Sequence, residues 1–116
     1  MKLQQVKEIL DATLYGEEGL LDEEVEAACG CDLMSDVLAF ASERNLLLTG
    51  LINLQVIRTA EMLDMKGIIF VRGKKPTEEM MDLARNKQIC LLSTNMPLYV
   101  ACGKLYMMGL GGKGDY

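Results

Sequence analysis

One pattern recurs three times in the second half of the chain: a short apolar run, a polar or glycine-containing turn, and then an amphipathic helical segment. The apolar runs with their turns read LLLTG, GIIFVRG and CLLSTN, and they begin at Leu46, Gly67 and Cys90. A strand followed by a helix at this spacing builds a parallel sheet that is covered on its faces. The sequence therefore predicts a three-layer α/β fold, with a mostly parallel sheet of four to five strands and helices on both faces.

The length of the chain, 116 residues, suits one domain, and its hydrophobic and charged fractions are those of ordinary globular proteins. We expect a single α/β domain over residues 1–108 and a flexible glycine-rich tail over 109–116. The apolar periodicity predicts strands at 13–15, 24–31, 46–49, 67–71 and 89–93. Asp32, Asn53 and Thr77 are expected to cap the helices that follow them. The last helix, 97–108, is expected to bury Leu98, Ala101, Cys102, Leu105 and Met108.

Charge and hydropathy exclude several classes of function. The apolar runs end within a few residues, well short of the roughly 20 residues that span a bilayer. The N-terminal segment lacks the continuous apolar core of a signal peptide, so we expect a cytoplasmic protein with no membrane partner. The net charge of −5 repels phosphate backbones, which argues against a nucleic acid partner.

Catalytic and metal chemistry are poorly supported. The chain has no histidine, so neither a Ser-His nor a Cys-His nucleophile pair can be assembled. Its four cysteines include no C-x-x-C pair, and the usual zinc-ligand spacings are absent. Cys29 and Cys31 lie on one face of an expected strand and would bind a metal only if they met a third thiolate in space. We therefore predict no catalytic residue, no metal ligand and no cofactor, with this cysteine pair as the open alternative.

A candidate binding site follows from the predicted topology. In open α/β sheets, ligands bind beyond the carboxyl ends of the strands, where helix N-termini and turns meet. Most residues at these positions are also common cap or turn formers, which is the alternative interpretation. The cationic turn at Arg72 and Lys74 suits an anion, and the alternative interpretation is a solvated turn that keeps the protein soluble. The candidate ligand-binding residues are Asp32, Ser35, Thr49, Gly50, Asn53, Arg72, Gly73, Lys74, Ser93, Thr94 and Asn95.

From Leu20 to about Met108 the sequence resembles a DRTGG domain. The segments that carry the resemblance are LLDEEVEAA, CDLMSDVLAFA, GIIFVRGKKPTEEMMDLA and ICLLSTNMPLY. DRTGG domains occur beside CBS domains in some pyrophosphatases and within phosphotransacetylases, and they are similar to the N-terminal domain of HPr kinase/phosphorylase. Val71, Arg72 and Gly73 stand where the family has its Thr-Gly-Gly turn, and Leu51 and Ile52 stand in place of its Asp-Arg. The resemblance implies a non-catalytic regulatory or assembly domain that is often dimeric.

Two classes of function remain. The first is a non-catalytic module that self-associates, as a homodimer, and acts with a separately encoded partner enzyme. Its support includes nine methionines, which can form adaptable apolar surface. The second is a small-ligand sensor that binds a nucleotide or another anion at the strand ends. The sequence favours the first class.

Overall fold

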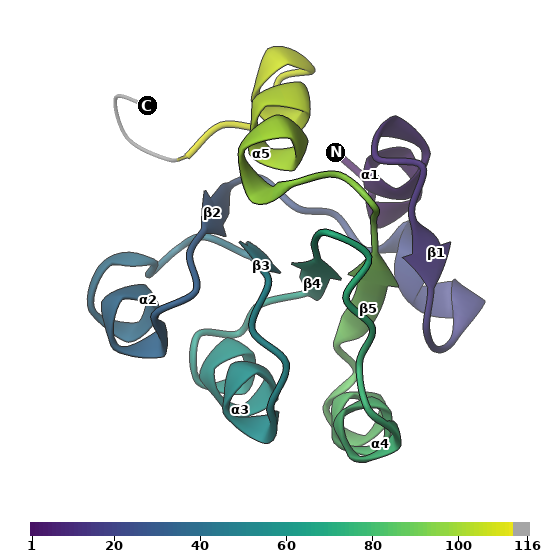
Figure 1. Ribbon diagram of the computed structural model, residues 1–116, viewed down its shortest axis with the longest axis vertical. Helices are drawn as coiled ribbons and strands as arrows, with labels where there is room; N and C mark the ends of the chain where they lie inside the picture. The colour runs from purple at the N-terminus through teal and green to yellow at the C-terminus, as the bar shows by residue number, and fades with distance from the viewer. Residues whose placement is uncertain (113–116) are drawn as a thin grey trace.

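A five-stranded sheet forms the middle layer of the structure, a computed structural model that describes residues 1–112 (Figure 1). The strands lie in the order β1-β5-β4-β3-β2. β1 is antiparallel to β5, and all other neighbours are parallel. The predicted three-layer α/β class with a mostly parallel sheet is confirmed. The strands are β1 (Thr13–Leu14), β2 (Ala28–Gly30), β3 (Leu46–Thr49), β4 (Gly67–Phe70) and β5 (Cys90–Ser93).

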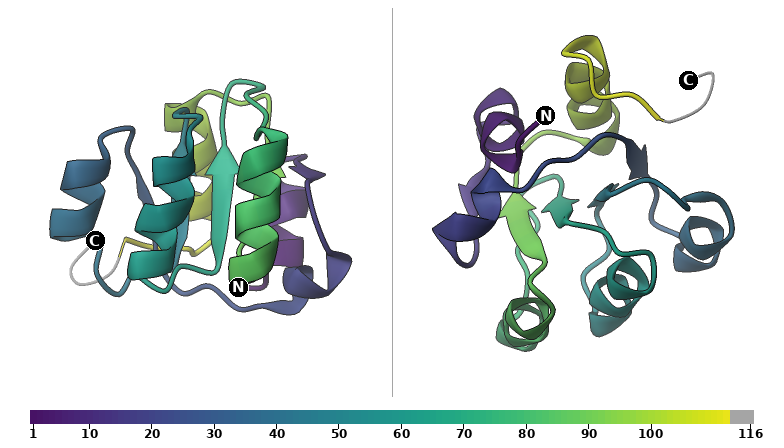
Figure 2. Two further views of the ribbon diagram at one scale, coloured as in Figure 1. Left: turned by 90° about the horizontal axis from the view of Figure 1, so that it is seen from below. Right: turned by 180° about the vertical axis from the view of Figure 1, so that it is seen from behind.

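Helices cover both faces of the sheet. The three crossover helices α2, α3 and α4 connect neighbouring parallel strands and stand side by side on one face, while α1 and α5 lie on the other (Figures 1 and 2). A short 3₁₀ helix, η1, follows β1. Within residues 1–112, no helix is long and apolar enough to cross a membrane. The helices are α1 (Leu3–Ile9), η1 (Glu18–Asp22), α2 (Met34–Phe40), α3 (Leu54–Met62), α4 (Glu78–Lys87) and α5 (Leu98–Met107).

The central strands are buried at every position, which explains why their sequences are continuous apolar runs. Leu46 and Leu48 face the core beneath α1 and α5, whereas Leu47 faces the core beneath α2, α3 and α4. β4 alternates in the same way, with Ile69 on the first side and Phe70 on the second. Both layers of helices are therefore required to remove these strands from water.

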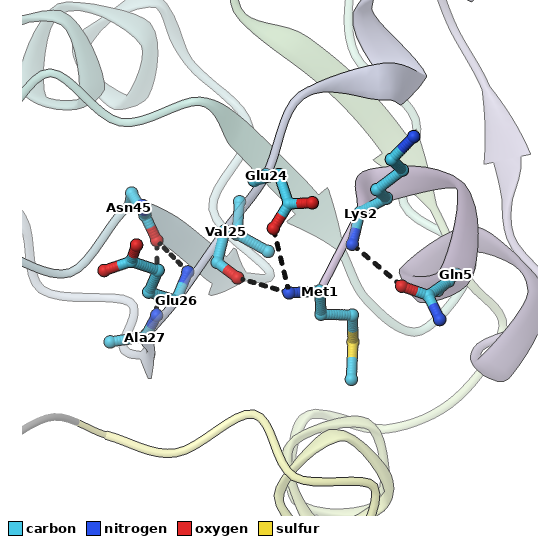
Figure 3. A network of polar contacts seen from close by, with 8 residues as sticks. All are labelled: Met1, Lys2, Gln5, Glu24, Val25, Glu26, Ala27 and Asn45. Carbon is cyan, nitrogen blue, oxygen red and sulfur yellow. Dashed lines mark hydrogen bonds and ion pairs between the residues drawn. The ribbon is translucent and has the colours of Figure 1, made fainter.

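The first parallel strand is shorter than expected. The sequence predicted a strand over 24–31, but β2 spans Ala28–Gly30. The preceding residues pair with the N-terminus instead, through an isolated antiparallel bridge between Lys2 and Glu24. The α-amino group of Met1 donates a hydrogen bond to the Val25 carbonyl at 3.0 Å and lies 3.6 Å from the Glu24 carboxylate (Figure 3).

Asn45 fixes the turn into β2 from the other side. Its Oδ1 accepts hydrogen bonds from the backbone N–H groups of Glu26 and Ala27, at 2.9 and 3.2 Å (Figure 3). These two amides are thus satisfied by a side chain and not by a neighbouring strand. The apolar and polar alternation of residues 24–31 did not distinguish the two kinds of partner.

Two of the three predicted helix caps are confirmed. The Asn53 side chain accepts from the Val56 N–H, and the Thr77 side chain accepts from the Met80 N–H, both at 3.2 Å. The prediction for Asp32 is wrong, because the N-cap of α2 is Leu33, with no side-chain hydrogen bond.

The residues after α5 pack on the free edge of β2. Leu110 is buried, and the Gly111 carbonyl accepts a hydrogen bond from the Ala28 N–H at 3.0 Å. The Arg44 Nε donates to the Gly112 carbonyl at 2.7 Å. Residues 113–116 of the predicted tail lie outside the described residues, and the division of the chain at residue 108 stays a prediction.

Candidate functional site

The register of the sheet aligns the carboxyl ends of three parallel strands. Thr49 is paired with Phe70, which is in turn paired with Ser93. The loops that follow are hydrogen-bonded to each other, since the Arg72 N–H donates to the Met96 carbonyl and the Gly73 N–H donates to the Thr94 carbonyl, each at 2.9 Å. The predicted rim is therefore one continuous edge of the molecule, which we call the strand-end rim.

Asp32 joins β2 to this rim. Its Oδ1 accepts one hydrogen bond from the Thr49 hydroxyl at 2.9 Å and another from the Gly50 N–H at 2.7 Å. The Thr49 hydroxyl itself accepts from the Leu51 N–H at 3.2 Å. Thr49 is fully buried, so the carboxylate supplies the acceptor that its hydroxyl requires. These bonds hold Asp32 on the turn after β3 and explain why it does not cap α2.

Arg72 and Asp32 flank Gly50 from two sides. A Cβ added to Gly50 would lie 3.6 Å from a terminal nitrogen of the Arg72 guanidinium and 3.8 Å from Asp32 Oδ1. Arg72 is exposed and takes part in none of the ion pairs found among residues 1–112. The side chains of Arg72, Val71 and Asp32 thus surround Gly50, and the exposed guanidinium is the group among them that suits an anion.

The turn after β4 has an unusual backbone. Arg72 and Gly73 both have positive φ, of 56° and 71°, so the chain takes two consecutive left-handed steps. A Cβ on Gly73 would lie 3.2 Å from the Asn95 Oδ1. The backbone of this turn lies against the loop that follows β5, whereas the Arg72 guanidinium lies beside Gly50 on the other side.

Several of the predicted site residues use their polar groups to stabilise the fold. The buried Thr94 donates its hydroxyl hydrogen to the Leu10 carbonyl at 2.7 Å, and Ser93 donates to the Lys74 carbonyl. Asn53 is occupied as a helix cap. The predicted residues whose side chains are exposed on the surface are Asp32, Ser35, Asn53, Arg72, Lys74 and Asn95.

The rim is an open surface. The five best-formed cavities within residues 1–112 have linings that include none of the predicted site residues. The most spacious is a shallow hollow of about 570 Å³ along the outer side of α5. A ligand at the rim would therefore be held by polar contacts more than by enclosure.

The thiols are poorly suited to metal binding. Burial, followed by the effect of the nearby Cys31, raises the pKa of Cys29 to about 11, and burial raises the pKa of Cys90 to about 11. Both thiols are protonated at neutral pH, whereas the thiolate is the form that binds metals and acts as a nucleophile. The described residues contain no group of three histidine, cysteine or acidic side chains placed to hold a metal ion.

Sequence reasoning missed a second surface, on α5. Met108, predicted to be buried, is 61% exposed, and α5 also exposes Tyr99 and Met107. The signal was present in the sequence, because residues 98–108 are apolar on nearly every side of a helix and a sheet covers only one side.

The architecture defines a three-layer α/β domain with an open polar rim at its strand ends. It is similar to the crystal structure of the CBS and DRTGG domains of the regulatory region of a Clostridium perfringens pyrophosphatase, complexed with its activator diadenosine tetraphosphate, with a TM-score of 0.76. The two chains are 17% identical, and the match covers 98% of this chain and 51% of the other, so this chain spans about half the length of its neighbour. The fold is DRTGG-like, as the sequence predicted. No protein-family model and no curated protein sequence matches the chain.

Proposed function

We propose that this protein is a non-catalytic regulatory or assembly module that self-associates as a homodimer and acts with a separately encoded partner enzyme. The observation that carries the proposal is the DRTGG-like fold, since the neighbour of this fold belongs to the regulatory region of an enzyme. A cytoplasmic location is part of the same proposal. The absence of histidine supports a non-catalytic role, because histidine is the only side chain whose unperturbed pKa lies near neutral pH.

Self-association is supported by the amount of exposed apolar surface. Tyr99, Tyr106 and Met107, all on α5, are 89%, 59% and 86% exposed. Monomeric proteins rarely expose large contiguous apolar patches, and such patches commonly mark interaction sites. Methionine adds to this surface a flexible and polarisable side chain that adapts to a partner.

Sedimentation velocity tests the proposal directly. At protein concentrations from about 1 to about 100 µM, we expect a monomer–dimer equilibrium whose average mass rises with concentration. A sedimentation coefficient that corresponds to a monomer at every concentration would contradict self-association.

The strand-end rim supports a second candidate function, a sensor for a nucleotide or another small anion. Arg72 is exposed, lies next to Gly50 and is followed two residues later by the exposed Lys74. Guanidinium groups and the N-termini of helices are common binding partners of phosphate. The regulatory region that shares the fold was crystallised with a nucleotide activator, which is consistent with a sensing role.

A thermal-shift screen tests the sensor. The probes are inorganic phosphate, AMP, ADP, ATP and diadenosine tetraphosphate, and a ligand at about 100 times its Kd adds about 2.7 kcal/mol to the free energy of unfolding. We expect Arg72→Ala to abolish the shift caused by a binding probe. The matched control is Arg58→Ala, which removes an exposed arginine from α3 and should leave the shift unchanged.

Two results would contradict the sensor. If none of the probes raises the melting temperature, the rim does not bind this class of anion under the conditions tested. If a probe binds Arg72→Ala and wild type equally well, it binds elsewhere on the protein.

A further inference from the structure

Helix α5 is apolar around almost its whole circumference. Ala101 and Leu105 are buried against the sheet. On the opposite side, Tyr99 and Tyr106 are 89% and 59% exposed, and Met107 is 86% exposed. A helix that is apolar on all sides is typical of a helix that is buried on all sides. Within residues 1–112, however, no helix or strand lies over the outer side of α5 (Figure 1).

A glycine occupies the middle of this outer side. Gly103 is four residues after Tyr99 and four before Met107, so helical spacing places it between them on the same face. A glycine inside a helix destabilises it relative to alanine. Within the described residues nothing explains this choice, because a Cβ on Gly103 would meet no atom within 4 Å. A close approach by another backbone from outside the domain would explain it.

Resting on the proposed self-association, we propose that two copies of this chain dock through α5, with the two helices crossing at Gly103 across a two-fold axis. In such an interface the same patch serves both partners, so Gly103 faces Gly103 and the absence of side chains lets the helices come close together. The shallow hollow over Gly103, between the tyrosines and Met107, is the space that the helix of the partner would enter.

The available area suits a weak, reversible dimer. The exposed parts of Tyr99, Val100, Tyr106 and Met107 amount to roughly 500 Å² of apolar surface per copy. With all of this surface covered, two copies would bury roughly 1,000 Å² in total, below the roughly 1,200 to 2,000 Å² of stable interfaces and within the range of weak, reversible ones. Aromatic side chains and methionine are enriched in the centres of such interfaces. The charged Lys104 borders the hollow and would lie at the polar rim of the interface.

The substitution Gly103→Ala separates this proposal from a purely structural role of α5. In the monomer the added methyl group meets no neighbour and improves helix propensity, so the melting temperature of the monomer should rise by about 3 °C. In the dimer the two methyl groups would force the helices apart, so Gly103→Ala should weaken association while it stabilises the monomer. Gly103→Leu should abolish association.

A second variant tests the rest of the patch. Tyr106→Glu places a charge at the interface and should weaken association at least about 30-fold, the effect of losing an interface hot spot. The matched control is Phe40→Glu, which places the same charge on the 72% exposed Phe40 of α2, on the opposite face of the sheet, and should leave association unchanged. Association is measured by sedimentation velocity, and folding of each variant is checked by circular dichroism.

The outcomes distinguish the interface from the broader function. The proposal is overturned if wild type dimerises and both Gly103→Leu and Tyr106→Glu still dimerise with the wild-type Kd. In that case self-association stands and a different surface mediates it, and a loss of association in Phe40→Glu would place that surface on α2. A wild type that stays monomeric at every concentration overturns the proposed self-association and this interface together.

Discussion

Removing the Asp32 carboxylate should destabilise the fold even though the side chain lies at the surface. Its Oδ1 is the acceptor for two donors, the hydroxyl of the fully buried Thr49 at 2.9 Å and the N–H of Gly50 at 2.7 Å. In Asp32→Ala, water can reach the amide of Gly50, which is only half-buried, but the Thr49 hydroxyl loses the acceptor of its hydrogen.

The size of the effect follows from these two bonds. Hydrogen bonds to charged groups contribute about 1.5 to 3 kcal/mol, and a buried donor left without an acceptor costs about 1 to 3 kcal/mol. Because the Asp32 carboxylate is exposed and partly hydrated, we expect the lower part of this range, a loss of about 1.5 kcal/mol in the free energy of unfolding. For a domain of this size, that loss lowers the melting temperature by roughly 6 °C.

Urea denaturation followed by circular dichroism measures the change. Asp32→Asn keeps an acceptor oxygen and should lose less than half as much stability. Asp36→Ala removes an exposed carboxylate from the first turn of α2 and should stay within about 0.5 kcal/mol of wild type. In a double-mutant cycle with Thr49→Val, Asp32→Ala should show a coupling energy of about 1 kcal/mol. The reasoning is refuted if Asp32→Ala is as stable as Asp36→Ala.

Two further predictions concern the core and its thiols. Phe70 is fully buried between the sheet and α2, α3 and α4, so Phe70→Ala should lower the free energy of unfolding by about 3 to 5 kcal/mol, and a loss below about 1 kcal/mol in urea denaturation would contradict this packing. Burial raises the pKa of Cys29 and Cys90 from 9.0 to about 11, so between these pH values the folded state keeps thiol protons that the unfolded state releases. The contribution of the two thiols to stability is therefore complete below pH 9 and is lost as the pH rises toward 11. Urea denaturation from about pH 7 to about pH 10.5 should show this loss, and a Cys29→Ala/Cys90→Ala double variant with the same pH dependence as wild type would show that the loss has another origin.

The sequence was informative wherever a pattern depended on neighbouring residues. The buried runs that begin at Leu46, Gly67 and Cys90 gave the three central strands, because strands covered on both faces have no polar side. The caps at Asn53 and Thr77 were correct because the acceptor and its donor are three residues apart.

The sequence was less informative wherever the partner lay far along the chain. Aspartate just before a helix is a common N-cap, but the groups that donate hydrogen bonds to the Asp32 carboxylate are 17 and 18 residues away. Residues 24–27 alternate like a strand and pair instead with the N-terminus and Asn45. Local patterns specify which groups need partners, and they do not specify which of several distant partners is chosen.

By itself, then, the sequence determined the α/β class, the order of strands and helices along the chain, and the set of polar residues that follow the strands, since these depend on periodicity and on short-range hydrogen bonds. The tertiary structure alone decided that Arg72 and Asp32 flank Gly50, that Thr94 is bonded to the Leu10 carbonyl, and that one side of α5 is left uncovered. These outcomes depend on how the sheet and its two layers of helices pack, and packing brings together groups whose separation in sequence carries no signal.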